Sequence, residues 1–193
     1  MKRSHIVCFL LLFGLGCVHI QSHPDSWRPE ASKTSPEDCL NISGVYANAG
    51  EGPKGGPVKL ANWLNLNTDH NPQHANENNA LWHDLSDASS VELNLSENGV
   101  LTIIAKGPIK SRTWSYEKSK RQLECKNGIL TVHFSGDGSG DGVAAFESNS
   151  LELQRVGNDL VVNRVENAFG FMLFIPAWGH ESLWGRFKPW VNP

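Results

Sequence analysis

The sequence predicts an all-β domain, an antiparallel meander of about nine or ten short strands closed or partly closed into a barrel, with one short helix. Apolar and polar residues alternate through most of the chain after residue 88, which is the pattern of strands with one buried face. Turn signals such as Asn98-Gly99 and Asn127-Gly128 separate these runs and favour tight hairpins. A β-sandwich built from the same strands is the alternative.

The expected elements follow one another closely along the chain. The first strand is expected at 42–47. The one helix is expected at 58–66, where Leu60, Trp63 and Leu64 share a face. The other strands are expected at 91–95, 100–105, 109–116, 122–125, 129–134, 143–146, 151–156, 160–165, 169–175 and 183–187.

Residues 1–16 have the composition of a secretory signal peptide. Lys2 and Arg3 supply a positive start, and an apolar run of eleven residues follows. A membrane-spanning helix needs ~20 apolar residues, so this run is too short to span a bilayer. The small residues Gly14 and Gly16 suit signal-peptidase cleavage at the end of this segment, so the sequence predicts export.

The Gly16-Cys17 junction resembles the lipobox of bacterial lipoproteins, in which the cysteine becomes the lipid-carrying first residue of the mature chain. We therefore expect lipidation, including palmitate, at Cys17. An ordinary secretory cleavage beside a chance cysteine is the alternative. Residues 17–38 are rich in Pro, Ser and charge, which predicts a disordered tether. Residues 39–193 then form a single β-barrel-like domain.

The charge balance excludes some classes of partner. Loss of the signal peptide leaves 15 of the 17 basic residues against all 20 acidic ones, so the formal net charge falls from −3 to −5. A mildly acidic chain without a basic run argues against a nucleic-acid partner and against electrostatic attraction to a membrane.

The cysteines agree with export. Cys8 and Cys17 belong to the targeting region, which leaves Cys39 and Cys125 in the folded domain. Two cysteines in an oxidising compartment are expected to form a disulfide, with two separate buried thiols as the alternative. Neither cysteine has a second ligand at the spacing of a metal site.

A histidine-rich stretch is the longest insertion between the expected strands, and long loops on rigid β scaffolds often carry binding sites. Its candidate metal ligands are Asp69, His70, His74, His83 and Asp84. His70 and His74 would share a helix face, but Pro72 lies between them and the Asn-rich surroundings are typical of a loop. We therefore expect solvated loop histidines and no metal.

Residues 135–148 resemble a calcium-binding loop in part. Asp137, Ser139 and Asp141, followed by Gly142, match its first, third, fifth and sixth positions. The twelfth position, which should be an acid, is Ser148, so we expect an acidic hairpin loop, with weak calcium binding as the alternative.

No catalytic motif accompanies these stretches. The chain has no nucleophile elbow, zinc-protease motif or phosphate-binding loop, so we expect neither an enzyme nor a cofactor. Asn41 and Asn94 begin glycosylation sequons, which matter only in a eukaryotic source.

Two motifs carry a family resemblance. The opening "CLNISGVYANAGEG", residues 39–52, and the ending "LWGRFKP", residues 183–189, resemble a group of small, uncharacterised bacterial envelope lipoproteins. Gly44-Val45-Tyr46 is also similar to the Gly-x-Trp of the first lipocalin strand, with Tyr46 in place of the Trp. The resemblance implies an envelope address and a lipocalin-like β fold, but no activity.

Two residues of these motifs have expected structural roles. Tyr46 is expected to bury its ring and keep its hydroxyl paired. Arg186 stands between Trp184 and Phe187, where its guanidinium could lie over an aromatic ring at one end of the barrel, with ordinary core packing as the alternative.

These observations together predict a non-catalytic lipoprotein of the cell envelope, anchored to the outer membrane through lipid on Cys17 and facing the periplasm, with secretion as the alternative. We expect it to bind an apolar small molecule or another envelope component. The alternatives are a metal-assisted hydrolase that uses the loop 69–84 and a structural or assembly protein. A ligand-sized interior cavity would favour the carrier, and a filled barrel with an exposed apolar patch would favour the assembly protein.

Overall fold

The computed structural model describes residues 17–20, 24–27, 39–64, 87–108, 111–140, 143–172 and 175–191. These residues form twelve strands in two sheets, one α-helix and three short 3-10 turns. All strand pairs but one are antiparallel, and the sheets do not close completely. The prediction of an all-β, partly closed barrel is confirmed.

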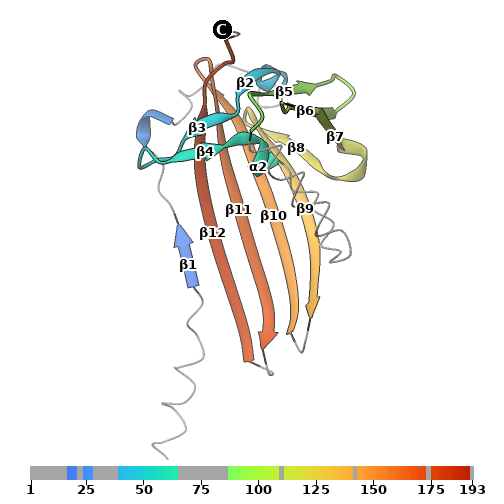
Figure 1. Ribbon diagram of the computed structural model, residues 1–193. Helices are drawn as coiled ribbons and strands as arrows, with labels where there is room; N and C mark the ends of the chain where they lie inside the picture. The colour runs from blue at the N-terminus through green and yellow to red at the C-terminus, as the bar shows by residue number, and fades with distance from the viewer. Residues whose placement is uncertain are drawn as a thin grey trace, which may run out of the picture.

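The larger sheet holds eight strands and dominates the molecule (Figure 1). Its path runs in the order β4-β3-β12-β11-β10-β9-β8, and β1 pairs with the outer edge of β12. Its strands are β1 (Cys17–Ile20), β3 (Ala49–Glu51), β4 (Pro57–Lys59), β8 (Leu123–Lys126), β9 (Ile129–Gly140), β10 (Val143–Val156), β11 (Asp159–Met172) and β12 (Ile175–Phe187).

The smaller sheet has four strands in the order β2-β5-β6-β7. They are β2 (Gly44–Ala47), β5 (Ser90–Leu95), β6 (Val100–Lys106) and β7 (Ser111–Glu117). The chain after β12 joins this sheet to the larger one. Ala47 N–H donates to Lys188 O at 2.9 Å, and Trp190 N–H donates to Val45 O at 2.8 Å. The barrel is therefore closed on the side of β2 and β12.

The other side of the barrel stays open, between β7 and β8. These strands are neighbours in sequence, joined by the 3-10 turn η4 (Lys118–Lys120), and they form no ladder among the described residues. Two hydrogen bonds join the start of the seam: Gln122 N–H donates to Glu117 O at 3.3 Å, and Glu117 N–H donates to the Gln122 side chain at 3.1 Å.

Strands β9 to β12 are much longer than expected. β10 and β11 each have 14 residues, β12 has 13 and β9 has 12. The separate short strands expected at 143–146 and 151–156 are one continuous strand, β10. The strand expected at 160–165 continues to Met172 as β11. The strand expected at 169–175 is therefore wrong as one element, because β11 ends at Met172 and Ile175 already begins β12. The polar residues between the expected strands resemble a break in sequence, but their backbone continues the ladder with both neighbouring strands. Figure 1 shows these four strands running well past the smaller sheet.

The helix α2 (Leu60–Leu64) begins two residues later than expected, because Val58 and Lys59 belong to β4. Its residues Leu60, Ala61 and Leu64 are completely buried in the barrel. Asn48, also fully buried, holds the start of this helix: Ala61 N–H donates to Asn48 Oδ1 at 2.7 Å, and Asn48 Nδ2 donates to Ala88 O at 2.9 Å.

Two pieces of the expected tether lie on the domain. β1 pairs in parallel with β12, and the 3-10 turn η1 (Asp25–Trp27) places Trp27 in a buried position. The backbone edge of β12 and the burial of a large indole outweigh the polar composition of this segment. The rest of residues 17–38 lies outside the described residues. No described helix has the length and apolar character needed to cross a membrane.

Candidate functional site

The interior of the barrel is occupied by side chains. Leu93 of β5, Ile103 of β6, and Leu151 and Leu153 of β10 meet the residues of α2 in one hydrophobic cluster, and each of these four is at most 1% exposed. The ring of Trp63 packs edge-to-face on Phe187, with centroids 6.0 Å apart. The helix thus fills the space in which a lipocalin-like barrel would hold a ligand.

A hollow of about 540 Å³ lies at the open side of the barrel. We call it the seam pocket. Its lining combines the β5–β6 turn with η4, β8 and β9, and consists of Cys39, Leu95, Ser96, Glu97, Asn98, Gly99, Lys118, Leu123, Cys125 and Leu130. The volume falls within the ~300–1,000 Å³ of small-molecule sites. Leucine side chains from three strands therefore share this hollow with the charged groups of Glu97 and Lys118.

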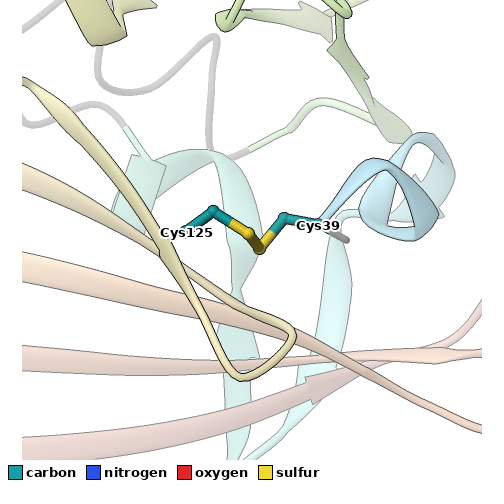
Figure 2. Close-up of a disulfide and its surroundings, with 2 residues drawn as sticks. All are labelled: Cys39 and Cys125. Carbon is teal, nitrogen blue, oxygen red and sulfur yellow. A yellow bond between two sulfur atoms is a disulfide. The ribbon is translucent and has the colours of Figure 1, made fainter. Parts of the chain in front are cut away.

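A disulfide lines the same pocket. Cys39 and Cys125 are bonded, with S–S 2.05 Å and Cα–Cα 6.0 Å, across a sequence separation of 86 residues. Figure 2 shows the bond passing from the turn η2 (Leu40–Ile42) to β8. This is the pair that the cysteine count predicts. It ties β8, which borders the open seam, to the beginning of the domain.

A second, smaller hollow of about 290 Å³ lies beside the β3–β4 hairpin. Trp63 and Trp184 line it together with Lys54. The indole ring of Trp63 packs directly on the backbone of β12 at Gly185, since a Cβ added to this glycine would lie 2.8 Å from the ring. The close approach of ring and backbone makes this region a packed wall with only a shallow opening.

The stretches expected to be loops are only partly described. His70, His74 and His83, with Asp69 and Asp84, lie outside the described residues. Asp137 and Ser139 belong to β9, which is extended and paired with β10 up to Gly140, so this part of the chain does not curl as a calcium loop must. Asp141 and Gly142 lie outside the described residues. The residues that the structure does describe contain no cluster of three or more possible metal ligands.

Arg186 pairs with a carboxylate. Its Nε and one terminal nitrogen each lie 2.6 Å from Asp159 Oδ2. A cation–π contact is made by a different arginine: the guanidinium of Arg112 lies over the Trp114 ring, 5.8 Å from the centroid. The suggested stacking of Arg186 on an aromatic ring is thus replaced by an ion pair, because the register of β11 and β12 brings Asp159 within reach.

The ring of Tyr46 is buried and its hydroxyl is hydrogen-bonded, as the sequence analysis predicts. Its hydroxyl donates to Ile42 O at 2.8 Å, and the ring is 2% exposed. A Cβ at Gly44 would lie 3.4 Å from this ring, which is an ordinary van der Waals distance, so the contact does not require glycine at this position. Burial raises the pKa of Tyr46 above its usual value, although the nearby positive charge of Arg155 opposes this.

Cys17 lies in β1 at the position opposite Gly179 of β12. The residue before Gly179 is Trp178, which is 42% exposed, and its cross-strand partner Phe169 is 45% exposed. Sequence reasoning did not identify this aromatic pair, because it assigned residues 169–175 to one strand and placed Trp178 in no strand, whereas Phe169 lies in β11 and Trp178 in β12. The uninterrupted apolar run is the signal that could have revealed it.

Comparison with models of protein families, with curated proteins and with solved structures finds no match to the chain.

Proposed function

We propose that the chain is a non-catalytic lipoprotein of the cell envelope, anchored to the outer membrane through lipid on Cys17 and facing the periplasm, which binds another envelope component on its outer surface. The lipobox-like Gly16-Cys17 junction supports the anchor. The filled interior supports surface binding, and it is the observation that carries this proposal over a lipocalin-type carrier.

The packing of α2 gives the physical reason. Leu60, Ala61 and Leu64 are completely buried against residues of both sheets. A ligand of any size would have to displace this helix, and each displaced leucine would lose about 1.5–3 kcal/mol of burial. An apolar molecule therefore has no low-cost way into the interior.

The seam pocket supports a second candidate, a binding site for a small apolar molecule. Its leucines Leu95, Leu123 and Leu130 offer apolar contact, and Lys118 and Glu97 could fix a polar end. The site is open to solvent at the unpaired seam, so it would cover only part of a ligand.

Fractionation tests the anchor, and native mass spectrometry distinguishes the two modes of binding. The wild-type protein should stay with the outer membrane, whereas Cys17→Ser should be released into the soluble periplasmic fraction. The released protein should carry no small molecule. A stoichiometric apolar ligand whose binding is lost in Leu123→Lys would favour the carrier. The matched control is Thr102→Lys, on a part of β6 that does not line the pocket.

Metal analysis tests the hydrolase alternative. Protein purified without chelator should contain zinc and calcium well below one ion per chain. One tightly held ion per chain, lost in His70→Ala or His74→Ala, would overturn the non-catalytic proposal.

A further inference from the structure

The end of the β11–β12 hairpin is the most apolar part of the domain. Residues 168–178 read AFGFMLFIPAW, eleven residues without a charged side chain. We call its described residues, 168–172 and 175–178, the apolar end. It belongs to the part of the long sheet that runs past the smaller sheet (Figure 1), so the barrel core does not account for its composition.

The described side chains of the apolar end face solvent. Phe169 and Trp178 stand directly opposite each other in the β11–β12 ladder and are 45% and 42% exposed. Two large neighbouring aromatic residues exposed on one sheet face indicate a surface that is covered in the working state of the protein.

The register of β1 places the proposed anchor beside this surface. Cys17 lies opposite Gly179, directly after Trp178, and the strands are parallel, so β1 leads away from the apolar end toward Ser182. The mature N-terminus therefore begins next to Trp178. Acyl chains on Cys17 would enter the bilayer at this point.

The reach of the hairpin can be compared with the thickness of the membrane surface. From Gly179 to the end of β12 at Ile175 the strand spans four residues, about 13 Å at ~3.3 Å per residue. Each headgroup layer of a bilayer is only ~5–8 Å thick. With Cys17 held at the membrane surface, a hairpin directed toward the bilayer is long enough to reach the hydrocarbon boundary.

The next residues along the strands limit how deep the hairpin can go. Asn167 and His180 follow on the face that carries Phe169 and Trp178, with 2.7 Å between His180 Nδ1 and Asn167 Oδ1. Glu166 and Glu181 stand opposite each other in the following row of the ladder. Aromatic residues followed by polar and charged ones are the order found where proteins meet the membrane interface.

The neighbouring β9–β10 hairpin differs from the apolar end. Asp137 lies in β9, and Asp141 lies between the strands in sequence. Asp137 lies in the same row of the sheet as Phe169 and Trp178, because it pairs with Phe146 and Phe146 pairs with Phe169. Carboxylates are costly in hydrocarbon, so the membrane contact requires a tilted sheet in which the β12 edge lies deepest and the β9–β10 hairpin stays among the headgroups. Without a basic cluster, attachment should depend on apolar contact and should not require anionic lipid.

We propose that the apolar end inserts into the membrane interface beside the lipid on Cys17, as a second point of attachment that holds the long sheet against the bilayer. This inference rests on the proposed lipid anchor. The occupant of the aromatic surface is the phospholipid bilayer itself, because the anchor and the aromatic pair lie at adjacent positions of one strand ladder.

Fluorescence quenching by lipid tests the contact. The lipidated mature protein is placed in phosphatidylcholine vesicles whose acyl chains carry bromine, which quenches tryptophan at short range. The chain has seven tryptophans, so the contribution of Trp178 is the difference between wild type and Trp178→Phe. We expect this substitution to remove most of the quenching. The matched control Trp190→Phe replaces a half-buried tryptophan at the β2 side of the barrel. This variant should be quenched as strongly as the wild type.

The outcomes separate this inference from the proposed anchor. Protein that fails to float with the vesicles contradicts lipidation at Cys17. Protein that floats but shows the same quenching in wild type and Trp178→Phe keeps its anchor and overturns the membrane contact.

A second copy of the chain is the competing occupant of the aromatic surface. Analytical ultracentrifugation of Cys17→Ser protein should show a monomer. A dimer that dissociates on Phe169→Ser, together with absent quenching, would assign the surface to self-association and overturn the membrane contact.

Discussion

Burial of polar groups sets the chemistry of several single residues in the domain. Asn48 is completely buried and joins the start of α2 to the segment before β5. Tyr116 is 4% exposed, and its hydroxyl lies 3.4 Å from Leu64 O, to which Trp114 Nε1 also donates at 2.8 Å. Sequence patterns mark such residues only as polar positions among apolar ones, because their partners lie far away in the chain.

Asn48→Ala should lower the free energy of unfolding by about 2–6 kcal/mol, since Ala61 N–H and Ala88 C=O would each lose a buried partner at a cost of about 1–3 kcal/mol. Urea denaturation measures this. The control Asn94→Ala, at an exposed position of β5, should change stability by less than about 0.5 kcal/mol. If both substitutions changed the free energy of unfolding equally, the hydrogen bonds of Asn48 would make no specific contribution to stability.

The tyrosines predict a stability loss at high pH. Burial is the main cause that raises the pKa of Tyr116 to about 12 from the usual 10.0, against the opposing effects of Trp114 and Arg112. Above pH 10 the unfolded chain loses a proton that the folded protein retains. The free energy of unfolding should therefore fall between pH 10 and pH 12, by about 2–3 kcal/mol from Tyr116 alone.

Ultraviolet titration checks this directly, because the chain has only two tyrosines, Tyr46 and Tyr116, and burial raises the pKa of both. The folded protein should show little tyrosinate absorbance at pH 10.5, and Tyr116→Phe should weaken the fall in stability above pH 10. Half-ionised tyrosines in folded protein at pH 10 would contradict the burial argument.

At the scale of elements, sequence periodicity predicted the strands of the barrel well and the length of β9 to β12 poorly. Alternation with Asn-Gly turns identifies β5, β6 and β8 closely, since each has one face in the core. The long strands change environment along their length, from core to solvent, so their polar middle residues look like turns. The parallel pairing of β1 with β12 depends on contacts distant in sequence and has no local signal.

The disulfide is expected to stabilise the open side of the barrel. Closing a chain segment of 86 residues should contribute about 4–5 kcal/mol through the reduced entropy of the unfolded chain. The double variant Cys39→Ala/Cys125→Ala should lose about this much stability in urea. Hydrogen exchange should show the largest loss of protection in β8, which borders the seam. A uniform loss over all strands would argue against a local role.

Two glycines of the β3–β4 hairpin, Gly50 in β3 and Gly56 in the turn, are expected to respond differently to substitution by alanine. A Cβ at Gly50 would lie 2.3 Å from the Phe187 ring and 2.7 Å from Arg186 O, so Gly50→Ala must separate β3 from β12. We expect a loss of about 1–3 kcal/mol in thermal or urea unfolding. Gly56, with nothing within 4 Å of an added Cβ, provides the control, and Gly56→Ala should be nearly neutral. If Gly50→Ala left the stability unchanged, the close packing of β3 on β12 would be contradicted.

At the scale of the whole molecule, the two ends of the long sheet have different surroundings. One end forms the closed, filled half of the barrel with β2, α2 and the smaller sheet. The other carries the exposed pair Phe169 and Trp178 beside the start of β1. The disulfide pair could be predicted from the count of cysteines in the folded part of the chain. The filled interior and the exposed aromatic pair could not, because both depend on which elements meet in space.

The proposed function and the membrane contact share one requirement, which is lipid on Cys17. The intact mass of the mature protein, purified from the envelope of an expressing bacterium, tests this most directly. We expect a chain that begins at Cys17, with a diacylglyceryl group on its sulfur and an acyl chain on its amino group. The variant Cys17→Ser should show neither modification. An unmodified wild-type chain that begins at Ser22 or beyond would contradict the account.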